Sequence, residues 1–521
     1  MEAWRLFTTL SLVCIFTLLI RLYNALVREP KRLRASLSRQ GVRGPPPTLL
    51  LGNILQIKKA REANKQANPA EATNPSHEES TKLSHKGVAA LFAFLEQWRQ
   101  QFGDVFMFAL GNSQILCIVQ PDLVKEITTC TTLDLGKPSH QQQDLGPLLG
   151  QGILTSNGST WAHQRKILAP ELYMDKVKGM MSLIVDSTNS VVRSWSSAVD
   201  AAEGGVADIN IDEYMRSFSG DVISRACFGS NYAEGEEIFL KLTALQEDMS
   251  KKGLSTGIPG MRHIPTKSNL KAWALEKEIR NLILQVAQER KQGRYEKDLL
   301  QMVLEGAQSG HFSQQETDRF IVDNCKNIYL AGYETTAVAA TWCLMLLASD
   351  HEWQDRVRAE VMETFKGGVP DFDMLRKLKQ MSMVIHEALR LYPPVPIVSR
   401  QALEELKFGS ITVPKNVNVW TVVTAIHTDP EVWGPDAYEF NPSRFENGIS
   451  GACKHPHFYM PFGVGPRMCL GQNLAMVELK ILISLLVSNF SFAISPSYIH
   501  SPALRLVIEP EHEVQLLIKK L

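Results

Sequence analysis

The stretch "PFGVGPRMCLGQ", from Pro461 to Gln472, is the most informative part of the sequence. It places one cysteine between an arginine and a glycine, directly ahead of a predicted amphipathic helix. It matches F-x-x-G-x-R-x-C-x-G at every fixed position: Phe462, Gly465, Arg467, Cys469 and Gly471. With a ~5% chance for each residue, a match somewhere in this chain has a probability on the order of one in ten thousand. The stretch therefore predicts a dedicated chemical site centred on Cys469.

A long helix is expected before this stretch. It opens with a capping box from Ser313 to Glu316 and runs to about Ala348 without proline, which corresponds to roughly 50 Å. Its middle contains "AGYETT", residues 331–336. Glycine costs about 1 kcal/mol relative to alanine inside a helix, and threonine loses rotamer freedom. The motif therefore indicates a functional site, with a packing reason for Gly332 as the alternative.

Three shorter patterns are informative only in combination. "VIHEALRLYPP" places Glu387 and Arg390 three residues apart on one helical face, and two prolines end that helix. "FNPSRF" places Arg444 in a loop rich in turn residues, and "WAHQRK" places Trp161 and Arg165 at helical i,i+4 spacing. Taken singly, the Glu387–Arg390 spacing is more typical of a solvated ion pair. The Trp161–Arg165 spacing is equally typical of a core tryptophan beside a surface arginine.

Taken together, the motifs resemble one protein family. Phe462 to Gly471 resembles the haem-binding loop of the cytochrome P-450 family of haem-thiolate monooxygenases. The other motifs follow that family's order along the chain: Trp161 and Arg165, "AGYETT", Glu387 and Arg390, Arg444, and Cys469. The similarity covers essentially the whole chain after its N-terminal segment. It implies a mainly α fold with small β-sheets, the cytochrome P-450 fold, behind a single N-terminal transmembrane helix.

The resemblance implies haem b with the Cys469 thiolate as axial ligand. A lone cysteine binds iron only as a thiolate, and a helix beginning near Gly471 is expected to lower the pKa of the thiol through its dipole and free N–H groups. Gly465 and Gly471 are expected to leave room for the porphyrin, and Arg467 to pair with a propionate. The expected cofactor-contacting residues are Trp161, Arg165, Gly332, Arg400, Phe462, Arg467 and Gly471.

Two further sets of residues take their roles from the resemblance. Glu334 and Thr335 correspond to the acid-threonine pair that delivers protons, and Gly332 is expected to open the groove for dioxygen. Glu387, Arg390 and Arg444 resemble the buried salt-bridged triad behind the haem loop. The family's P-E-R-F reads Pro-Ser-Arg-Phe here, with Ser443 in place of the acid.

The implied reaction inserts one atom of dioxygen into a C–H bond and releases the other as water. No G-x-G-x-x-G stretch is present, so the electrons are expected from NADPH through a separate flavin-containing cytochrome reductase in the same membrane. One alternative is a haem-thiolate enzyme that rearranges an oxidised substrate without reductase. Such relatives often lack the acid-threonine pair, so Glu334 and Thr335 argue against it. A non-catalytic haem sensor is a further alternative.

The segments that line the family's substrate pocket are largely apolar here, which suits a large apolar skeleton. Candidate substrate contacts are His140, Leu330, Ala331, Ile397 and Val398, with Gln141 or Arg400 as further partners for a polar group. Runs such as "SNGSTWAHQRKILAPELY" and "RLYPPVPIVSRQA" resemble a plant clan that oxidises gibberellins, ent-kaurenoic acid and triterpenoid acids. We expect a terpenoid carboxylic acid as substrate, with a pentacyclic triterpenoid methyl group favoured over a gibberellin or ent-kaurenoic acid.

The N-terminus predicts a membrane anchor. An apolar run from Leu6 to Ile20, extended to Val27, provides the ~20 residues that span a bilayer. Seven basic residues against one acid lie between positions 21 and 43. By the positive-inside rule this tract stays in the cytosol. We expect a single-pass anchor, 1–27, in the endoplasmic reticulum membrane with a cytosolic catalytic domain. A cleaved signal peptide is the alternative, although no clear cleavage site follows.

The rest of the chain divides into a basic, proline-rich hinge, 28–57, and one catalytic domain, 58–521. "GPPP", residues 44–47, predicts a stiff extended connector, and the polar segment 58–86 is expected to be a disordered insertion. The 55 basic and 55 acidic residues cancel, which gives no indication of a nucleic-acid partner. The 8 cysteines contain no C-x-x-C pair, as expected for reduced thiols facing the cytosol.

Overall fold

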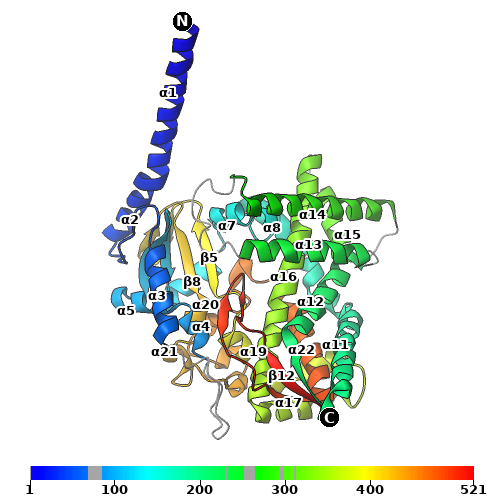
Figure 1. Cartoon of the computed structure of the whole chain (residues 1–521). Coiled ribbons are helices and arrows are strands. Elements are labelled where there is room, and N and C mark those ends of the chain that lie inside the picture. The colour runs from blue at the N-terminus through cyan, green and yellow to red at the C-terminus, as the bar shows by residue number, and fades with distance from the viewer. Residues whose placement is uncertain (1, 68–84, 230–231, 251–263, 294–297, 310–312) are drawn as a thin grey trace.

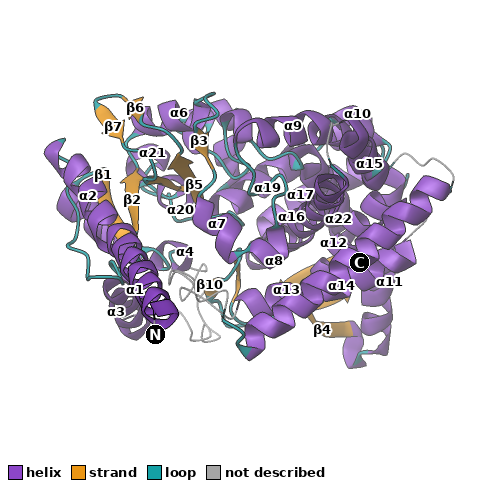
Figure 2. Ribbon diagram, turned by 90° about the horizontal axis from the view of Figure 1, so that it is seen from above, coloured by secondary structure: helices purple, strands orange, loops and turns teal. Residues whose placement is uncertain are grey.

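The computed structural model describes residues 2–67, 85–229, 232–250, 264–293, 298–309 and 313–521. Helices dominate these residues, and the strands form four small sheets. The helical layer occupies one side of the body and the largest sheet the other (Figures 1 and 2). The expected mainly α fold with small β-sheets is therefore confirmed.

The α-helices are α1 (Glu2–Tyr23), α2 (Glu29–Arg39), α3 (Ile54–Ala67), α4 (Gly87–Ala90), α5 (Ala93–Phe102), α6 (Pro121–Thr129), α7 (Ser139–Asp144), α8 (Gly146–Leu149), α9 (Gly158–Leu168), α10 (Met174–Lys178), α11 (Met181–Ala201), α12 (Ile211–Phe228), α13 (Tyr232–Ser250), α14 (Lys267–Gln292), α15 (Leu299–Ser309), α16 (Gln314–Ser349), α17 (His351–Phe365), α18 (Phe372–Lys377), α19 (Lys379–Leu391), α20 (Val423–His427), α21 (Pro430–Trp433) and α22 (Gln472–Asn489). The strands are β1 (Val105–Leu110), β2 (Ser113–Ile118), β3 (Leu135–Gly136), β4 (Val206–Asn210), β5 (Ile397–Ala402), β6 (Leu406–Phe408), β7 (Ile411–Val413), β8 (Asn418–Val422), β9 (Phe490–Ile494), β10 (Pro502–Leu504), β11 (Ile508–Pro510) and β12 (Gln515–Lys520).

The largest sheet has the strand order β1-β2-β8-β5-β3. Its first two strands confirm the strand-like runs of the sequence, and they pair antiparallel with Val105 opposite Ile118. β8 runs parallel to β2, and β5 antiparallel to β8 with Ile397 opposite Val422. This sheet therefore fixes the position of β5, which carries Ile397, Val398 and Arg400.

The long helix α16 is the central element of the helical layer (Figure 1). It begins with the expected capping box between Ser313 and Glu316 and continues to Ser349. It packs against α12, α14, α15, α17, α19 and α22. Nearly all its side chains from Phe320 to Ala348 are buried, although the helix contains a glycine and adjacent threonines. Tertiary burial therefore outweighs the unfavourable helix propensity of the "AGYETT" motif.

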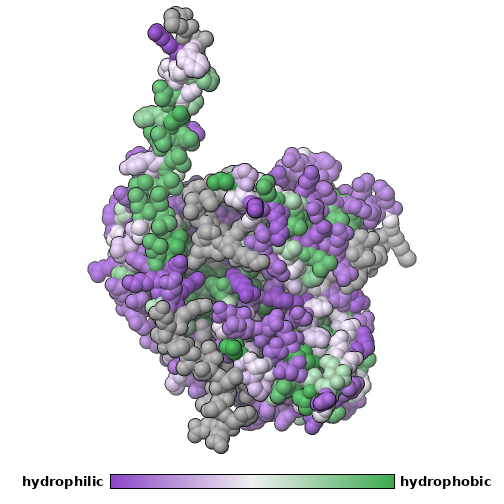
Figure 3. Space-filling model, viewed as in Figure 1, coloured by the Kyte–Doolittle hydropathy of each residue, from purple (hydrophilic) through white to green (hydrophobic). Residues whose placement is uncertain are grey.

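The N-terminal helix projects from the body and exposes its apolar side chains (Figures 1 and 3). Two helical stretches are long and apolar enough to cross a membrane, Trp4–Arg39 and Gln314–Ser349. The apolar 18-residue window of the second stretch is 83% buried inside the protein, whereas that of the first is 0% buried. The exposure of the N-terminal stretch is consistent with a membrane anchor, because a bilayer would cover its exposed apolar side chains.

The structure differs from the expected hinge and insertion. A π-helical turn, Asn24–Arg28, joins α1 to α2, and α2 buries Leu33 and Leu37 against the body. Hence part of the segment that we expected to be a hinge is helical and docked. Residues 58–67 of the expected disordered insertion belong to α3. Most of that insertion, 68–84, lies outside the described residues.

The expected triad lies together behind the cysteine loop. The side chains of Glu387 and Arg390 are fully buried, and Arg390 donates to both carboxylate oxygens of Glu387 at 2.7 Å. Arg444 Nε lies 3.4 Å from Glu387 Oε1, and its Nη2 lies 2.7 Å from Asp436 Oδ2. Asp436 thus gives Arg444 a second carboxylate, although Ser443 replaces the family's acid.

Replacement of Glu387 by alanine is expected to lower the free energy of unfolding by about 3–5 kcal/mol, because the guanidinium of Arg390 would remain buried without its counter-charge. The measurement is the thermal unfolding midpoint and the yield of folded protein. Glu404→Ala is the matched control, because the Glu404–Lys415 pair is more than half exposed at both side chains and should contribute little. Equal midpoints for the two variants would contradict the assigned role of the pair.

Candidate active site

The loop that carries Cys469 is folded tightly onto neighbouring backbone. The Cys469 N–H donates to the Phe462 carbonyl at 2.8 Å, and Gly463 and Gly465 adopt φ values of 70° and 74°. A Cβ at Gly465 would lie 2.2 Å from the carbonyl oxygen of Thr128 in α6. Gly465 therefore serves close packing against α6, and its expected role of leaving room for the porphyrin stays a prediction.

Gly471 matches the expectation of open space. It precedes α22, and no atom lies within 4 Å of the position that its Cβ would take. Phe462, in the same loop, is partly buried and packs against the main hydrophobic core. The loop thus leaves room next to Cys469 on the side of Gly471.

The Cys469 side chain is accessible although protein surrounds it. The residue is exposed, yet burial by surrounding protein is the largest influence on its thiol. Burial raises the pKa of this thiol, while hydrogen bonds from the N–H groups of Gly471 and Gln472 and the charge of Arg165 lower it. The expected helix-terminal effect is present, but burial outweighs it in the protein alone.

One face of α16 is also open. Ile328, Ala331, Gly332 and Thr335 are only partly buried, whereas their neighbours Tyr329, Leu330, Tyr333, Glu334 and Thr336 are buried. The open residues are three or four positions apart, so they share one helical face. We call these four residues the open stripe. It includes Ala331 as expected, but Leu330 lies in the core, away from the stripe.

The Thr335 hydroxyl donates to the Ala331 carbonyl at 2.6 Å. Gly332 has the packing reason that the sequence left open, because a Cβ there would lie 2.6 Å from Cδ1 of Ile223 in α12. Gly332 therefore has a packing role against α12 in addition to the expected role of opening a groove for dioxygen. Ser219 of α12 also donates to the carbonyls of Gly332 and Tyr333, at 3.0 and 2.7 Å.

Glu334 points toward α12 and away from the open stripe. Arg216 Nη1 lies 2.6 and 2.7 Å from its two carboxylate oxygens, and Arg216 Nη2 lies 2.6 Å from Glu509 Oε2. Both carboxylates are buried. The sequence gave no signal for Arg216, because an isolated arginine on an amphipathic helix is indistinguishable from a surface residue.

A group of partly buried cations lies beside the cysteine loop. Arg467 stacks 4.0 Å above the Trp161 ring and donates to the carbonyl of Ser156 at 3.3 Å. Arg165 lies 5.9 Å from the same ring and donates to the Met468 carbonyl at 2.9 Å. The expected cofactor residues Trp161, Arg165 and Arg467 are therefore brought together at the loop.

Two further cations belong to this group. Burial lowers the pKa of Arg400 to about 10, and burial with the nearby Arg400 charge lowers that of Arg467 to about 10. Burial, Arg400 and Arg467 lower the pKa of Lys137 well below its ordinary value. Among the described ion pairs, no carboxylate partners Lys137, Arg400 or Arg467. Cations that are partly removed from water without a counter-charge are costly, so this group fits an anionic ligand such as the two propionates of haem. Sequence reasoning missed Lys137.

The other expected contacts are less constrained. Ile397 and Val398 are partly buried on β5. Val395, which the sequence did not single out, is 46% exposed between buried prolines. The side chain of His140 lies outside the described residues. The described residues also contain no group of three His, Cys, Asp or Glu side chains that could hold a metal ion, which leaves Cys469 as a lone ligand.

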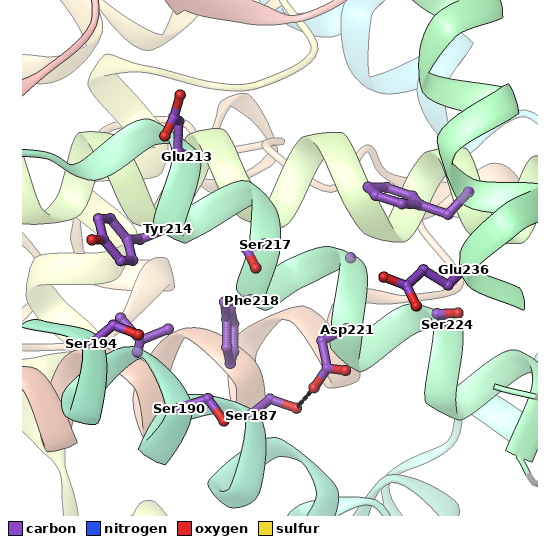
Figure 4. Close-up of a pocket in the computed structure, with 13 residues that line it drawn as sticks. Ser187, Ser190, Ser194, Glu213, Tyr214, Ser217, Phe218, Asp221, Ser224 and Glu236 are labelled. Atoms are coloured by element: carbon purple, nitrogen blue, oxygen red, sulfur yellow. Dashed lines mark hydrogen bonds between the residues drawn. The ribbon is translucent and has the colours of Figure 1, made fainter. Parts of the chain in front are cut away.

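A separate pocket of about 550 Å³ lies between α11, α12 and α13 (Figure 4). Its lining is rich in serine and carboxylate side chains, and the Ser187 hydroxyl donates to Asp221. None of the expected site residues lines it. It is therefore distinct from the candidate active site.

Lys137→Met is expected to change stability and haem binding in opposite directions. The haem-free protein should unfold at a higher temperature, because a partly buried cation without a carboxylate partner among the described residues is removed. Haem binding should weaken, because one partner of the propionates is lost. Thermal unfolding of the haem-free protein and haem titration measure the two effects, with the half-exposed Lys415→Met as control. A loss of stability without a loss of haem would refute the assignment.

Comparisons with known proteins agree with this geometry. A family model described as Cytochrome P-450 matches residues 82–517. Cytochrome P-450 714C2 of Oryza sativa subsp. japonica is 48% identical over 528 residues, which cover 100% of this chain and 99% of the relative. Cytochrome P-450 714B3 of Zea mays is 45% identical over 513 residues (98% and 95%), and Cytochrome P-450 714A2 of Arabidopsis thaliana is 41% identical over 514 residues (96% and 96%). This chain therefore belongs to the cytochrome P-450 family of monooxygenases, which bind haem through a cysteine thiolate.

Proposed function

We propose that this monooxygenase hydroxylates, or further oxidises, an unactivated C–H bond of a terpenoid carboxylic acid, and that a methyl group of a pentacyclic triterpenoid acid is the preferred target. One observation carries the catalytic part of this proposal. The exposed Cys469 lies beside a group of partly buried cations that have no carboxylate partner among the described residues. A haem supplies both an iron for the thiolate and two carboxylates for the cations.

The bound haem would supply the activation of dioxygen, which a thiolate ligand favours. The protein's own residues would hold and orient it. Lys137, Arg400 and Arg467 would pair with the propionates, and the ring of Trp161 supports the Arg467 guanidinium. The N–H groups of Gly471 and Gln472, which bond to the Cys469 sulfur, would limit the charge that the thiolate donates.

Thr335 and Glu334 would manage protons. The Thr335 hydroxyl lies on the open stripe. Its oxygen can accept a hydrogen bond from a proton donor while its own proton is donated to the Ala331 carbonyl. To pass a proton toward Thr335, the Glu334 carboxylate has to leave Arg216. Glu509 keeps Arg216 paired through the other nitrogen while this happens. Arg216 would thus restrain Glu334 without being left as an unpaired buried charge.

Electrons would come from NADPH through a partner cytochrome reductase. The sequence contains no G-x-G-x-x-G stretch for a nucleotide of its own. The exposed N-terminal helix would hold the chain in the endoplasmic reticulum membrane, with the catalytic domain in the cytosol. Both proteins would then share one membrane surface.

The substrate class rests on sequence resemblance to plant oxidases of gibberellins, ent-kaurenoic acid and triterpenoid acids, together with the apolar character of Ile397, Val398 and the open stripe. An oxidase of gibberellin or ent-kaurenoic acid is the alternative. The presence of Glu334 and Thr335 favours either over a rearranging enzyme that works without reductase.

Co-expression with a plant reductase in yeast membranes tests the substrate. Ent-kaurenoic acid, a gibberellin, and oleanolic and ursolic acids are offered together, and mass spectrometry detects gains of oxygen. A triterpenoid product is expected, and a diterpenoid product would favour the alternative. No product despite a thiolate carbon-monoxide spectrum would refute the substrate class. Cys469→Ala is the negative control and should lack that spectrum, whereas Cys453→Ala should retain it.

Thr335→Ala is expected to uncouple NADPH use from product formation in the same membranes. Loss of a positioned proton donor typically slows the chemical step by about 10²-fold or more, while electron delivery continues. The measurement is product formed per NADPH consumed. Thr335→Ser, which keeps the hydroxyl, should restore coupling, and full coupling in the alanine variant would argue against the proton-delivery role.

A further inference from the structure

Four polar side chains of α16 hold the loop between α8 and α9, residues 150–157. They are Asp323, Asn324, Lys326 and Asn327, and each is at most 7% exposed. We call these four residues the α16 clamp. They directly precede Ile328, the first residue of the open stripe, and the proposed mechanism uses none of them. Buried polar groups are costly unless their hydrogen bonds are satisfied, so the partners of the clamp indicate its role.

The backbone of the loop supplies most of these partners. The Asn327 side-chain amide accepts from the Leu154 N–H at 2.8 Å and donates to the Leu149 carbonyl at 2.7 Å. Asn324 Oδ1 accepts from the Ile153 N–H at 3.1 Å. The clamp therefore fixes the loop through its backbone, and these contacts do not depend on the side chains that the loop carries.

An ion pair extends the same contact toward α8. Asp323 Oδ2 accepts from the Gln151 N–H at 2.8 Å. Asp323 Oδ1 lies 3.0 Å from Lys326 Nζ, which also donates to the Pro147 carbonyl at 3.2 Å. Gly150 has a φ of 56°, and a Cβ there would lie 2.1 Å from Cγ of Asp323. A glycine at this position is thus required for the loop to approach α16 so closely.

The other end of the loop reaches the partly buried cations beside Cys469. Gln164 of α9 is 3% exposed, donates to the Gln151 carbonyl at 2.9 Å and accepts from the Ser156 hydroxyl at 2.7 Å. The Ser156 carbonyl accepts in turn from Arg467 Nη1 at 3.3 Å. The loop therefore forms a continuous hydrogen-bonded connection from α16 to the Arg467 guanidinium.

We propose that the residues of the α16 clamp are positioning residues, which fix the α8–α9 loop to α16 and thereby hold Arg467 where it can pair with a carboxylate of the haem. The inference rests on the proposed function, because that function assigns the haem propionates to the cations. A guanidinium that is already held in place loses less conformational freedom when its ligand binds. The clamp should therefore raise the affinity for haem without touching it.

The proposed connection has to act in both directions. If an ordered loop favours haem binding, haem binding must favour the ordered loop by the same factor. Hydrogen–deuterium exchange of a peptide that covers residues 149–156 measures this order, followed by mass spectrometry. In the full-length wild type in detergent, exchange of this peptide should slow when haem is added to the haem-free protein.

The main test compares Asn327→Ala with Asn53→Ala in the same preparation. Asn53 is the matched control, because it is also 0% exposed and its amide accepts from the Ala109 N–H at 2.8 Å and donates to the Pro46 carbonyl at 3.1 Å. Both variants should lower the unfolding midpoint of the haem-free protein. Only Asn327→Ala should speed exchange of the loop peptide and raise the haem dissociation constant, by roughly 5-fold or more, as is usual for coupled sites.

Two double variants carry the comparison if Asn327→Ala does not fold. Asp323→Asn with Lys326→Met removes the ion pair but keeps a side-chain oxygen for the Gln151 N–H. Asp323→Ala with Lys326→Met removes that oxygen as well. The first double variant should bind haem more tightly than the second, and its loop peptide should exchange more slowly.

The opposite results overturn the inference. Wild-type haem affinity in Asn327→Ala, despite faster exchange of the loop peptide, would show that the loop does not position Arg467. An equal loss of haem affinity in Asn327→Ala and Asn53→Ala would reduce the clamp to a contribution to general stability. Equal haem affinity of the two double variants would contradict the role of Asp323. Failure of the wild type itself to bind haem with a thiolate carbon-monoxide spectrum would instead refute the proposed haem-thiolate function, and the inference with it.

Discussion

The guanidinium of Arg390 is the constraint on which the cysteine loop depends. All five of its N–H donors are used, two by Glu387 and three by the carbonyls of His427, Ala437 and Glu439. Burial and Arg390 lower the pKa of His427 to about 3, so its ring is neutral. Its Nδ1 then donates to the Arg390 carbonyl and its Nε2 accepts from the Met460 N–H. The register of the chain entering the Cys469 loop is thereby fixed by hydrogen bonds at full burial.

Residues whose partners are close in sequence could be predicted, and residues whose partners are remote could not. The spacing of Glu387 and Arg390, the Ser313 capping box and the Cys469 loop each act within a few positions, so their patterns survive in the sequence. Arg216, by contrast, is 118 residues from Glu334. The packing partners of Gly332 and Gly465 could not be identified from the sequence for the same reason, because Ile223 and Thr128 come from distant helices.

The cations around the cysteine loop are of two kinds, those that the fold pairs with a carboxylate and those that it leaves for a ligand. Fully buried Arg390 is paired with Glu387, whereas partly buried Lys137, Arg400 and Arg467 have no carboxylate partner among the described residues. The motifs of the sequence pointed to Arg390, Arg400 and Arg467 but gave no signal for Lys137, and they did not show which cations lack a carboxylate. That distinction requires the positions of the carboxylates near each cation. A group of cations without carboxylate partners among the described residues is therefore stronger evidence for an anionic cofactor than any one arginine in a motif.

The two buried acids of α16 and α22 show that burial alone does not decide how a carboxylate is compensated. Glu334 of α16 is buried against Arg216 of α12, whose guanidinium also pairs with Glu509. Glu478 of α22 is 2% exposed and its Oε2 atom has no hydrogen-bond partner among the described residues. Burial raises the pKa of Glu478 to about 8. Environments that differ in one cation thus leave one acid with a paired charge and favour the neutral form of the other.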